Sequence, residues 1–337
     1  MKKSTLSIIM PNYNHGKFIG EAIQAIVEQS RLPDEFIIID DASTDNSIEI
    51  IRSYAEKYNF IQFFQNKKNM GSSYTQHKLL EYVNSDYVYG AASDDRVLQG
   101  FIEKSMNLLE KHPEAGLCST LVEFIDGKGK KTSVNNIAKF TNKAIYLSPS
   151  NCLELLENDE SWLSVSGNTT IYRKNALEAA GNFIPELESY ADGFTRKVIA
   201  LKFGACFIPE PLGAWRRMED GYSALASSDI GKSLLALNYA DTLMRTKFKD
   251  CFPKKLADKT TNLYLFWLLS DAWVKNKKNV TEILCAFQNK SFFDVILKFL
   301  AKFNNKVSDY LGKIFIIAKL KLWKSVINYL KFKLTRI

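Results

Sequence analysis

Long uncharged runs are missing from this chain of 337 residues. The longest stretch without Asp, Glu, Lys or Arg is Ser4–Gly16, which covers 13 residues and is largely polar after Met10. A membrane-spanning helix needs about 20 mostly apolar residues. The apolar run that ends at Pro11 is also too short for the core of a signal peptide. We therefore expect a protein that does not cross a membrane.

Cysteine is sparse as well. The five cysteines are widely spaced, their number is odd, and no Cys-x-x-Cys occurs. This pattern argues against both a disulfide framework and a zinc site. The sequence therefore predicts a protein of the reducing cytoplasm.

Acidic residues are scarce in only one part of the chain. The net charge is +8 and the pI is about 9.0, which admits a nucleic acid, an anionic membrane or an anionic substrate as partner. Residues 1–241 hold 25 Lys and Arg against 31 Asp and Glu, a net charge of −6. Residues 242–337 hold 20 against 6, a net charge of +14. The basic character thus belongs to the C-terminal part alone.

The first half of the chain alternates apolar, β-branched segments with amphipathic ones. The segments typical of buried strands are Leu6–Met10, Glu35–Asp41, Phe60–Gln65, Tyr87–Ala92 and Gly116–Ile125. The segments with helical spacing of apolar residues are Gly16–Gln29, Thr44–Tyr58, Ser73–Val83 and Val97–Glu110. Continuous apolar strands that alternate with amphipathic helices indicate an α/β protein with a mostly parallel sheet covered on both faces.

The rest of the chain changes character twice. From about Thr132 to Gly221 the pattern is less regular, with one expected strand and three expected helices, at Thr169–Tyr172, Ser150–Glu157, Lys174–Ala180 and Asp192–Phe203. After Tyr222 almost everything has helical periodicity, and Pro253 is the only proline. We predict a domain over residues 1–221 and a helical, basic region over 222–337.

Acidic residues gather where the expected strands end. Asp40 and Asp41 close the second strand, and Asp94 and Asp95 follow the fourth. In open parallel sheets ligands bind beyond the carboxyl ends of the strands. Carboxylates that converge there repel one another unless a cation or hydrogen-bond donors are present. A divalent cation that bridges a carboxylate and a diphosphate is the simplest arrangement.

Four segments in this order, PNYN, EFIIIDDASTDNS, NMG and ASDD, resemble the start of family 2 glycosyltransferases. The resemblance covers roughly residues 4–220. Members of that family are inverting enzymes of GT-A fold that mostly use UDP-sugars. The resemblance implies a nucleotide-sugar half over about 1–125 and an acceptor half over about 126–221.

The resemblance also assigns roles to single residues of the first half. Ala92 replaces the first acid of the family's Asp-x-Asp-Asp. Asp95 would bind Mn²⁺ or Mg²⁺, which neutralises the leaving diphosphate. The residues implied to contact the nucleotide are Pro11 and Tyr13 at the base, Asp41 at the uracil ring, Asn69 and Gly71 near the ribose and diphosphate, and Asp94 at the ribose.

In the second half, Asp192 matches the family's catalytic base, which takes the proton of the acceptor hydroxyl. The alternative is that Asp192 caps its helix and pairs with Arg196 one turn later. Arg216 and Arg217 match the segment that closes over the diphosphate, and either could bind phosphate. An ordinary surface pair is the alternative, and Met218 replaces a His of the family's segment.

The segment Ser291–Arg336 holds ten Lys and Arg against two Asp, with aromatic residues between them. A basic amphipathic helix with aromatics is typical of a protein that lies on an anionic membrane surface. The alternative is a helix packed on the catalytic domain with a solvated Lys face. Nucleic acid is not an expected partner, since no recognised module accompanies the tail.

These features together predict a peripheral enzyme on the inner face of the cytoplasmic membrane. It would transfer a sugar to a lipid-linked or surface-glycan acceptor in polysaccharide biosynthesis, such as that of lipopolysaccharide or capsule. Ala92 and Met218 keep open a non-catalytic scaffold that binds nucleotide-sugars. A nucleotidyltransferase is disfavoured because Pro11–Lys17 is not a glycine-rich, basic phosphate loop.

Overall fold

The computed structural model describes residues 3–134, 140–158, 167–218, 229–286, 292–303 and 306–319. The chain divides into two compact units. The first unit contains Met1–Pro185 and Ala191–Glu219, and the second contains Glu186–Tyr190 and Asp220–Ile337. The boundary predicted after residue 221 lies outside the described residues.

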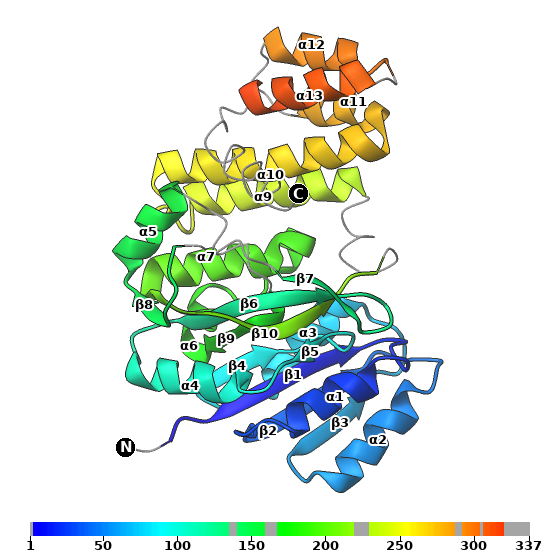
Figure 1. Ribbon diagram of the computed structural model, residues 1–337, viewed down its shortest axis with the longest axis vertical. Coiled ribbons are helices and arrows are strands. Elements are labelled where there is room, and N and C mark those ends of the chain that lie inside the picture. The colour runs from blue at the N-terminus through cyan, green and yellow to red at the C-terminus, as the bar shows by residue number, and fades with distance from the viewer. Residues whose placement is uncertain are drawn as a thin grey trace. The chain divides into compact units, whose positions relative to one another are not determined.

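One sheet forms the centre of the first unit (Figure 1). Its strand order is β3-β2-β1-β4-β9-β6-β10-β5. Four neighbours run parallel: β1 (Leu6–Asn12), β2 (Glu35–Asp40), β3 (Ile61–Gln65) and β4 (Tyr87–Gly90). The short strand β9 (Thr170–Arg173) runs antiparallel between β4 and β6 (Leu117–Ile125), and β10 (Ala205–Arg216) is parallel to β6. The mostly parallel α/β sheet predicted from the sequence is confirmed.

Helices cover the sheet because its strands are apolar on both faces. The helices of the first unit are α1 (Ile19–Val27), α2 (Ser47–Lys57), α3 (Ser72–Glu81), α4 (Phe101–Lys111), α5 (Pro149–Asn158), α6 (Lys174–Ala179) and α7 (Ala191–Phe203). Alternate residues of β1, Leu6, Ile8 and Met10, pack in one buried cluster with Ile23 and Ile26 of α1. The residues between them in β1 are buried as well, on the other face.

The strand β10 was not predicted, although it has 12 residues. Pro209 and Pro211 argue against a central strand, since proline cannot donate to a sheet ladder. The structure accommodates them with two register shifts against β6, between Ile208 and Pro211 and between Pro211 and Gly213. The short strands β5 (Arg96–Val97), β7 (Lys131–Val134) and β8 (Ile145–Leu147) were also missed.

The described part of the second unit is helical, as predicted. Its helices are α9 (Ile230–Arg245), α10 (Lys254–Lys275), α11 (Lys277–Ala286), α12 (Phe292–Leu300) and α13 (Lys306–Lys319). They share a core that contains Leu237, Leu269, Trp273 and Ile283. Within the described residues, none of the helices combines the length and hydropathy that crossing a membrane requires.

Gly213 of β10 offers a test of this packing, because a Cβ built there would lie 2.3 Å from Cγ2 of Thr169. We expect Gly213→Ala to lower the free energy of unfolding by about 1–3 kcal/mol, the usual effect of overpacking a core. The measurement is urea unfolding of the full chain. Gly127→Ala is the control, since a Cβ at Gly127 meets nothing within 4 Å, and it should change the value by under about 0.5 kcal/mol. Equal effects of the two substitutions would contradict this account of the packing.

Candidate functional site

The carboxyl ends of β1, β2 and β4 meet at one edge of the sheet, as parallel strands require. Asn12 pairs with Asp40 across β1 and β2, and the backbone N–H of Asp41 donates to the carbonyl of Asn12 over 2.8 Å. The N–H of Ala91 donates to the carbonyl of Ile9. The two acidic pairs therefore follow strands that end at the same edge, which the sequence predicted. Tyr13 is exposed and Pro11 half-buried at this edge.

Asp40 is fully buried and serves the turn that follows β2. Its carboxylate accepts hydrogen bonds from the Asn12 side chain (2.8 Å) and from the backbone N–H and hydroxyl of Ser43 (2.8 and 2.6 Å). These bonds satisfy a carboxylate that would otherwise be costly to bury. Asp40 thus shapes the loop but does not face open space.

Asp41 organises the loop before α3. Its Oδ1 accepts from the side-chain amide of Asn66 and from the N–H of Met70, and its Oδ2 accepts from the N–H of Gly71, over 2.8–2.9 Å. Asn69 Oδ1 also accepts from Gly71, whose φ of 91° favours glycine. The structure therefore brings Asn69 and Gly71 to the end of β2. Because a carboxylate oxygen can accept two hydrogen bonds, Asp41 Oδ2 retains one acceptor position.

Asp95 is held from two sides. Its Oδ1 accepts from the backbone N–H of Arg216 in β10, and its Oδ2 accepts from the side-chain amide of Asn168, both over 2.7 Å. Asn168 belongs to the 3-10 turn η2 (Gly167–Thr169) that leads into β9, and its carbonyl accepts from the hydroxyl of Tyr89 in β4. Asp95 is only 8% exposed. One carboxylate thus connects the ends of β4, β9 and β10.

Burial, together with the charge of Asp94, raises the pKa of Asp95 to about 8, although the hydrogen bonds from Arg216 and Asn168 lower it. Burial and the nearby Asp95 also raise the pKa of Tyr89. The protein groups around Asp95 therefore supply less positive charge than an ionised pair of acids needs. This donor set fits a divalent cation, since carboxylate oxygens are the ligands that Mg²⁺ and Mn²⁺ prefer.

The protein alone offers few ligands at this place. Among the described residues, no group of three or more His, Cys, Asp or Glu side chains is arranged to hold a metal ion. Mg²⁺ is commonly bound through one or two carboxylates together with substrate phosphates. Asp94 and Asp95 therefore suit a cation that arrives with a diphosphate.

Arg216 is buried behind the acidic pair, with 1% of its side chain exposed. Its Nε donates to the carbonyl of Asp94 (2.8 Å), Nη1 to the carbonyl of Asp126 (3.1 Å) and Nη2 to Glu21 (2.9 Å). The guanidinium also lies 4.5 Å from the ring centroid of Phe18. In this arrangement Arg216 fixes the backbone of Asp94 and is not open to a phosphate.

Arg217, the second arginine expected to bind phosphate, is exposed. Its guanidinium lies 3.6 Å from the ring centroid of Phe124. Of the two arginines, Arg217 is therefore the one that a ligand can reach.

Asp192 is the second residue of α7, and 47% of its side chain is exposed. Its Oδ1 accepts from the N–H of Gly193 (2.6 Å) and its Oδ2 from Nη1 of Arg196 (3.1 Å). The ion pair with Arg196, which the alternative interpretation of Asp192 predicted, is thus present, and it also orients the carboxylate. The end of α7 leads through Gly204 into the start of β10, and the carbonyl of Gly204 accepts a hydrogen bond from the N–H of Gly116, just before β6. The end of α7 therefore lies at the amino ends of these parallel strands. The start of α7, with Asp192, points towards their carboxyl ends.

Sequence reasoning missed the residues that hold these acids in place. Asn168 lies 73 residues from Asp95, and Glu21 lies 195 residues from Arg216. Asn66 is likewise 25 residues from Asp41. No local pattern marks such partners. The nearest signal was the strand expected from Thr169, which places Asn168 at a strand entrance.

Three comparisons with known proteins agree. The model of a family described as "Glycosyl transferase family 2" matches residues 7–181, just over half of the chain. An uncharacterized glycosyltransferase of Haemophilus influenzae is 35% identical over 113 residues, 33% of this chain and 45% of the relative. The minor teichoic acid biosynthesis protein GgaB of Bacillus subtilis is 27% identical over 236 residues, 67% of this chain and 24% of the relative. The chain thus spans less than half the length of these two relatives.

Solved structures show the same fold. The structure of S. aureus TarS 1–349 in complex with UDP-GlcNAc has a TM-score of 0.54 at 16% identity and covers 94% of this chain and 92% of that one. The mannosyltransferase PcManGT from Pyrobaculum calidifontis, in complex with GDP-Man and Mn²⁺, has a TM-score of 0.55 at 16% identity and covers 97% and 88%. At this identity the likeness extends to the fold and not to the ligands.

The hydrogen bond from Asn168 to Asp95 gives a direct test of the site. Asn168→Ala removes a donor to a buried carboxylate, and loss of such an outer partner typically weakens metal binding about 10- to 100-fold. We expect that loss in titrations of Mn²⁺ into the UDP-saturated protein, with UDP affinity in the absence of metal unchanged. Asn107→Ala, an exposed position on α4, is the control. Equal Mn²⁺ affinity of both variants and the wild type would refute the role given to Asn168.

Proposed function

Since the chain belongs to glycosyl transferase family 2, we propose that it transfers a sugar with inversion from a UDP-sugar to a lipid-linked or surface-glycan acceptor. The observation that carries this proposal is the Asp94–Asp95 pair, held at the carboxyl edge of the sheet by Arg216 and Asn168. The surrounding protein groups provide too little positive charge to balance two ionised acids. A donor whose diphosphate arrives with a cation would provide that charge.

The relatives support the choice of donor and acceptor classes. Two TarS structures contain UDP-GlcNAc and UDP, respectively, and the PcManGT structure contains GDP-Man with Mn²⁺. GgaB is a protein of minor teichoic acid biosynthesis, and another relative, TuaG of Bacillus subtilis, is a putative teichuronic acid biosynthesis glycosyltransferase. A nucleotide-sugar donor and a surface-glycan acceptor are therefore the classes we propose for this chain.

On this proposal the carboxyl edge forms the donor site. Asp95 would hold Mn²⁺ or Mg²⁺, which would offset the charge of the leaving diphosphate, and Asp94 would lie at the ribose. Asn168 and Arg216 fix the carboxylate and the backbone of this pair. The loop residues brought together at the ends of β1 and β2 would contact the nucleotide: Pro11, Tyr13, Asp41, Asn69 and Gly71. Arg217, which is exposed, would be the arginine that contacts a phosphate.

Asp192 would act as the general base. Its half-exposed carboxylate takes the proton of the acceptor hydroxyl as that oxygen forms a bond to the anomeric carbon. The bond from the anomeric carbon to the diphosphate oxygen breaks on the opposite side, so the configuration inverts. Arg196, which is buried, orients the carboxylate through its ion pair.

Substitution of the two acids tests these roles. We expect Asp192→Asn to reduce the transfer rate by about 10²–10⁴-fold, the usual contribution of a general base, with UDP affinity unchanged. Asp95→Asn should reduce both transfer and Mn²⁺ affinity. The measurement is metal-dependent transfer and donor hydrolysis over a panel of UDP-sugars.

Asp250→Asn, an exposed change in the second unit, serves as the control and should behave as wild type. Equal turnover by all variants would remove the roles assigned here. If the wild type binds UDP but turns over no donor with any acceptor extract, the scaffold alternative suggested by Ala92 and Met218 holds instead.

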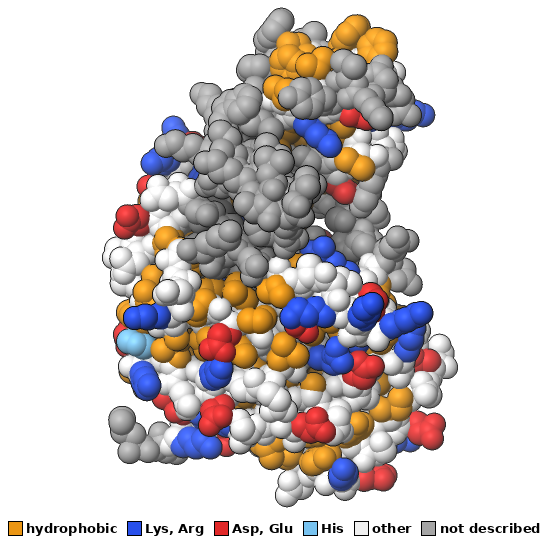
Figure 2. Space-filling model, in the orientation of Figure 1, with side chains coloured by type: hydrophobic (Ala, Val, Ile, Leu, Met, Phe, Trp, Pro, Cys, Tyr) orange, Lys and Arg blue, Asp and Glu red, His pale blue; other side chains and the backbone are white. Residues whose placement is uncertain are grey.

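We also propose that the second unit binds the cytoplasmic face of an anionic membrane. Phe299, near the end of α12, and Phe303, three residues after that helix, are 58% and 43% exposed, and their ring centroids lie 5.1 Å apart. Figure 2 shows hydrophobic side chains exposed in the region that Figure 1 labels α12. A lysine directly precedes each ring in the sequence, Lys298 before Phe299 and Lys302 before Phe303. Exposed aromatic rings beside lysines suit a lipid headgroup layer. The basic segment after Lys319 lies outside the described residues.

The aromatic pair makes the membrane proposal testable. We expect Phe299→Ser combined with Phe303→Ser to weaken co-sedimentation with phosphatidylglycerol vesicles by about tenfold or more, given the free energy of burying two aromatic side chains. Leu235→Ser removes a side chain that is 72% exposed on α9 and is the control. Unchanged sedimentation of the double variant would contradict the membrane role of this surface, whatever the result for sugar transfer.

A further inference from the structure

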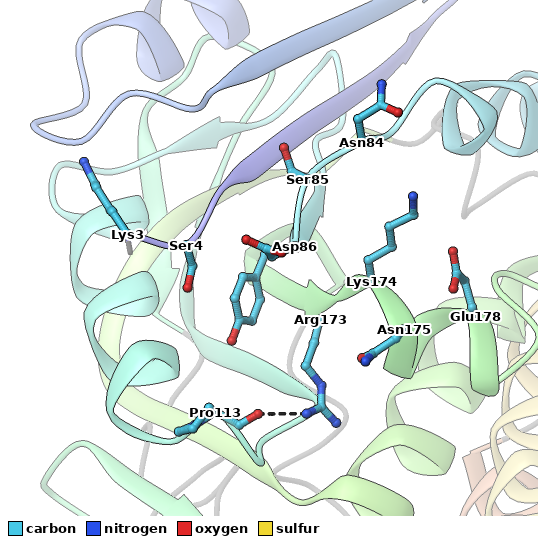
Figure 3. A pocket seen from close by; sticks show the side chains of 11 residues that line it. Lys3, Ser4, Asn84, Ser85, Asp86, Pro113, Arg173, Lys174, Asn175 and Glu178 are labelled. Carbon is cyan, nitrogen blue, oxygen red and sulfur yellow. Dashed lines mark hydrogen bonds between the residues drawn. The ribbon is translucent and has the colours of Figure 1, made fainter. Parts of the chain in front are cut away.

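A hollow lies at the other edge of the sheet, away from the acidic pairs. It has a volume of about 640 Å³ and is lined by residues from three parts of the first unit: Lys3–Ser4, Asn84–Tyr87 with Pro113, and Arg173–Asn175 with Glu178. Figure 3 shows these side chains arranged around it. Its volume falls within the range of small-ligand sites, about 300–1,000 Å³.

The topology places this hollow at the amino edge. Ser4 precedes β1 and Asp86 precedes β4, so both mark the amino ends of parallel strands. Arg173 ends β9, which runs antiparallel to β4 and pairs with Tyr87 there. The donor site proposed above lies at the carboxyl ends of the same strands. The two sites therefore use opposite edges of one sheet.

The hollow carries fixed charges of both signs. Lys3, Arg173 and Lys174 are basic, and Asp86 and Glu178 are acidic. Some of these groups are engaged. Asp86 accepts from Thr5, Lys174 donates to the carbonyl of Val83 over 2.7 Å, and Arg173 donates to the carbonyl of Pro113 over 2.7 Å. An incoming anion or cation would meet like charges as well as opposite ones.

Other polar groups in the hollow are not engaged. Within the described part of the chain, the side chains of Asn175 and Glu178 make no hydrogen bond or ion pair, and both are exposed. Figure 3 shows Asn175 and Glu178 on one side of the hollow and Lys3 on the other. Donors and acceptors thus face a common space.

We propose that this hollow binds a neutral glycan chain. A sugar hydroxyl both donates and accepts hydrogen bonds, so it would satisfy the carboxylate of Glu178 and the cation of Lys3 alike. A neutral ligand also avoids repulsion by either set of charges. This inference rests on the proposed function, because the acceptor or its elongated product is the polyhydroxylated chain that the protein would encounter. The hollow would hold that chain at a distance from the reacting hydroxyl.

The test is calorimetric titration of the full chain with neutral hexasaccharides, namely maltohexaose, chitohexaose and mannohexaose. We expect at least one to bind, and Asn175→Ala combined with Glu178→Ala to weaken that binding about tenfold, as loss of one or two hydrogen bonds to a charged group predicts. Both positions are exposed on α6, so the variant should fold. Glu56→Ala, an exposed acid on α2, is the matched control.

Three outcomes would overturn the inference: no saturable binding of any hexasaccharide, binding that the double variant does not weaken, or saturable binding of inorganic phosphate that the double variant abolishes. Donor hydrolysis, measured separately, should be the same in the double variant and the wild type. A wild type that binds glycan but neither transfers sugar from a donor nor hydrolyses one would defeat the proposed function and leave this site in place.

Discussion

The two hydrogen bonds that hold Asp95 organise the site. One comes from the backbone of Arg216 at the end of β10, and the other from Asn168 at the entrance to β9, each over 2.7 Å. Burying a carboxylate next to a second acid is unfavourable without such donors. The bonds therefore fix the position of the acidic pair and also tie together the ends of three strands. These two donors do not balance the charge of two ionised acids, so the pair is suited to a cation that arrives with a diphosphate.

The polar residues at the carboxyl edge divide into those that support the site and those that are open to a ligand. Asp40 and Arg216 are buried. Asp40 accepts hydrogen bonds from the loop after β2, and Arg216 donates to backbone carbonyls. Asp192 and Arg217 remain exposed or half-exposed. Rigid supports beneath a few open groups are what preorganised catalysis requires. The net acidity of residues 1–241 agrees with this use of carboxylates, and the basic residues lie in the other part of the chain.

Local patterns predicted the sheet and the edge where the acids meet, since alternation of strands and helices and the direction of parallel strands decide both. The strand β10 was not predicted, because its two prolines are untypical of a central strand. The structure accommodates them through register shifts against β6. The sequence suggested that Arg216 binds phosphate or lies on the surface, and it could not reveal the burial of this residue, because Glu21 and Asp126 lie far away in the chain. Contacts of this kind arise from tertiary packing and leave no local signature. The same holds for the hollow at the amino edge.

The central claim is that Asp94 and Asp95 bind a donor diphosphate through a cation. The most direct measurement is anomalous diffraction at the manganese edge from crystals grown with UDP and Mn²⁺. The account predicts one manganese peak within coordination distance of the Asp95 carboxylate and of the UDP diphosphate. Bound UDP with its manganese away from this pair, or UDP in the hollow at the amino edge, would contradict it.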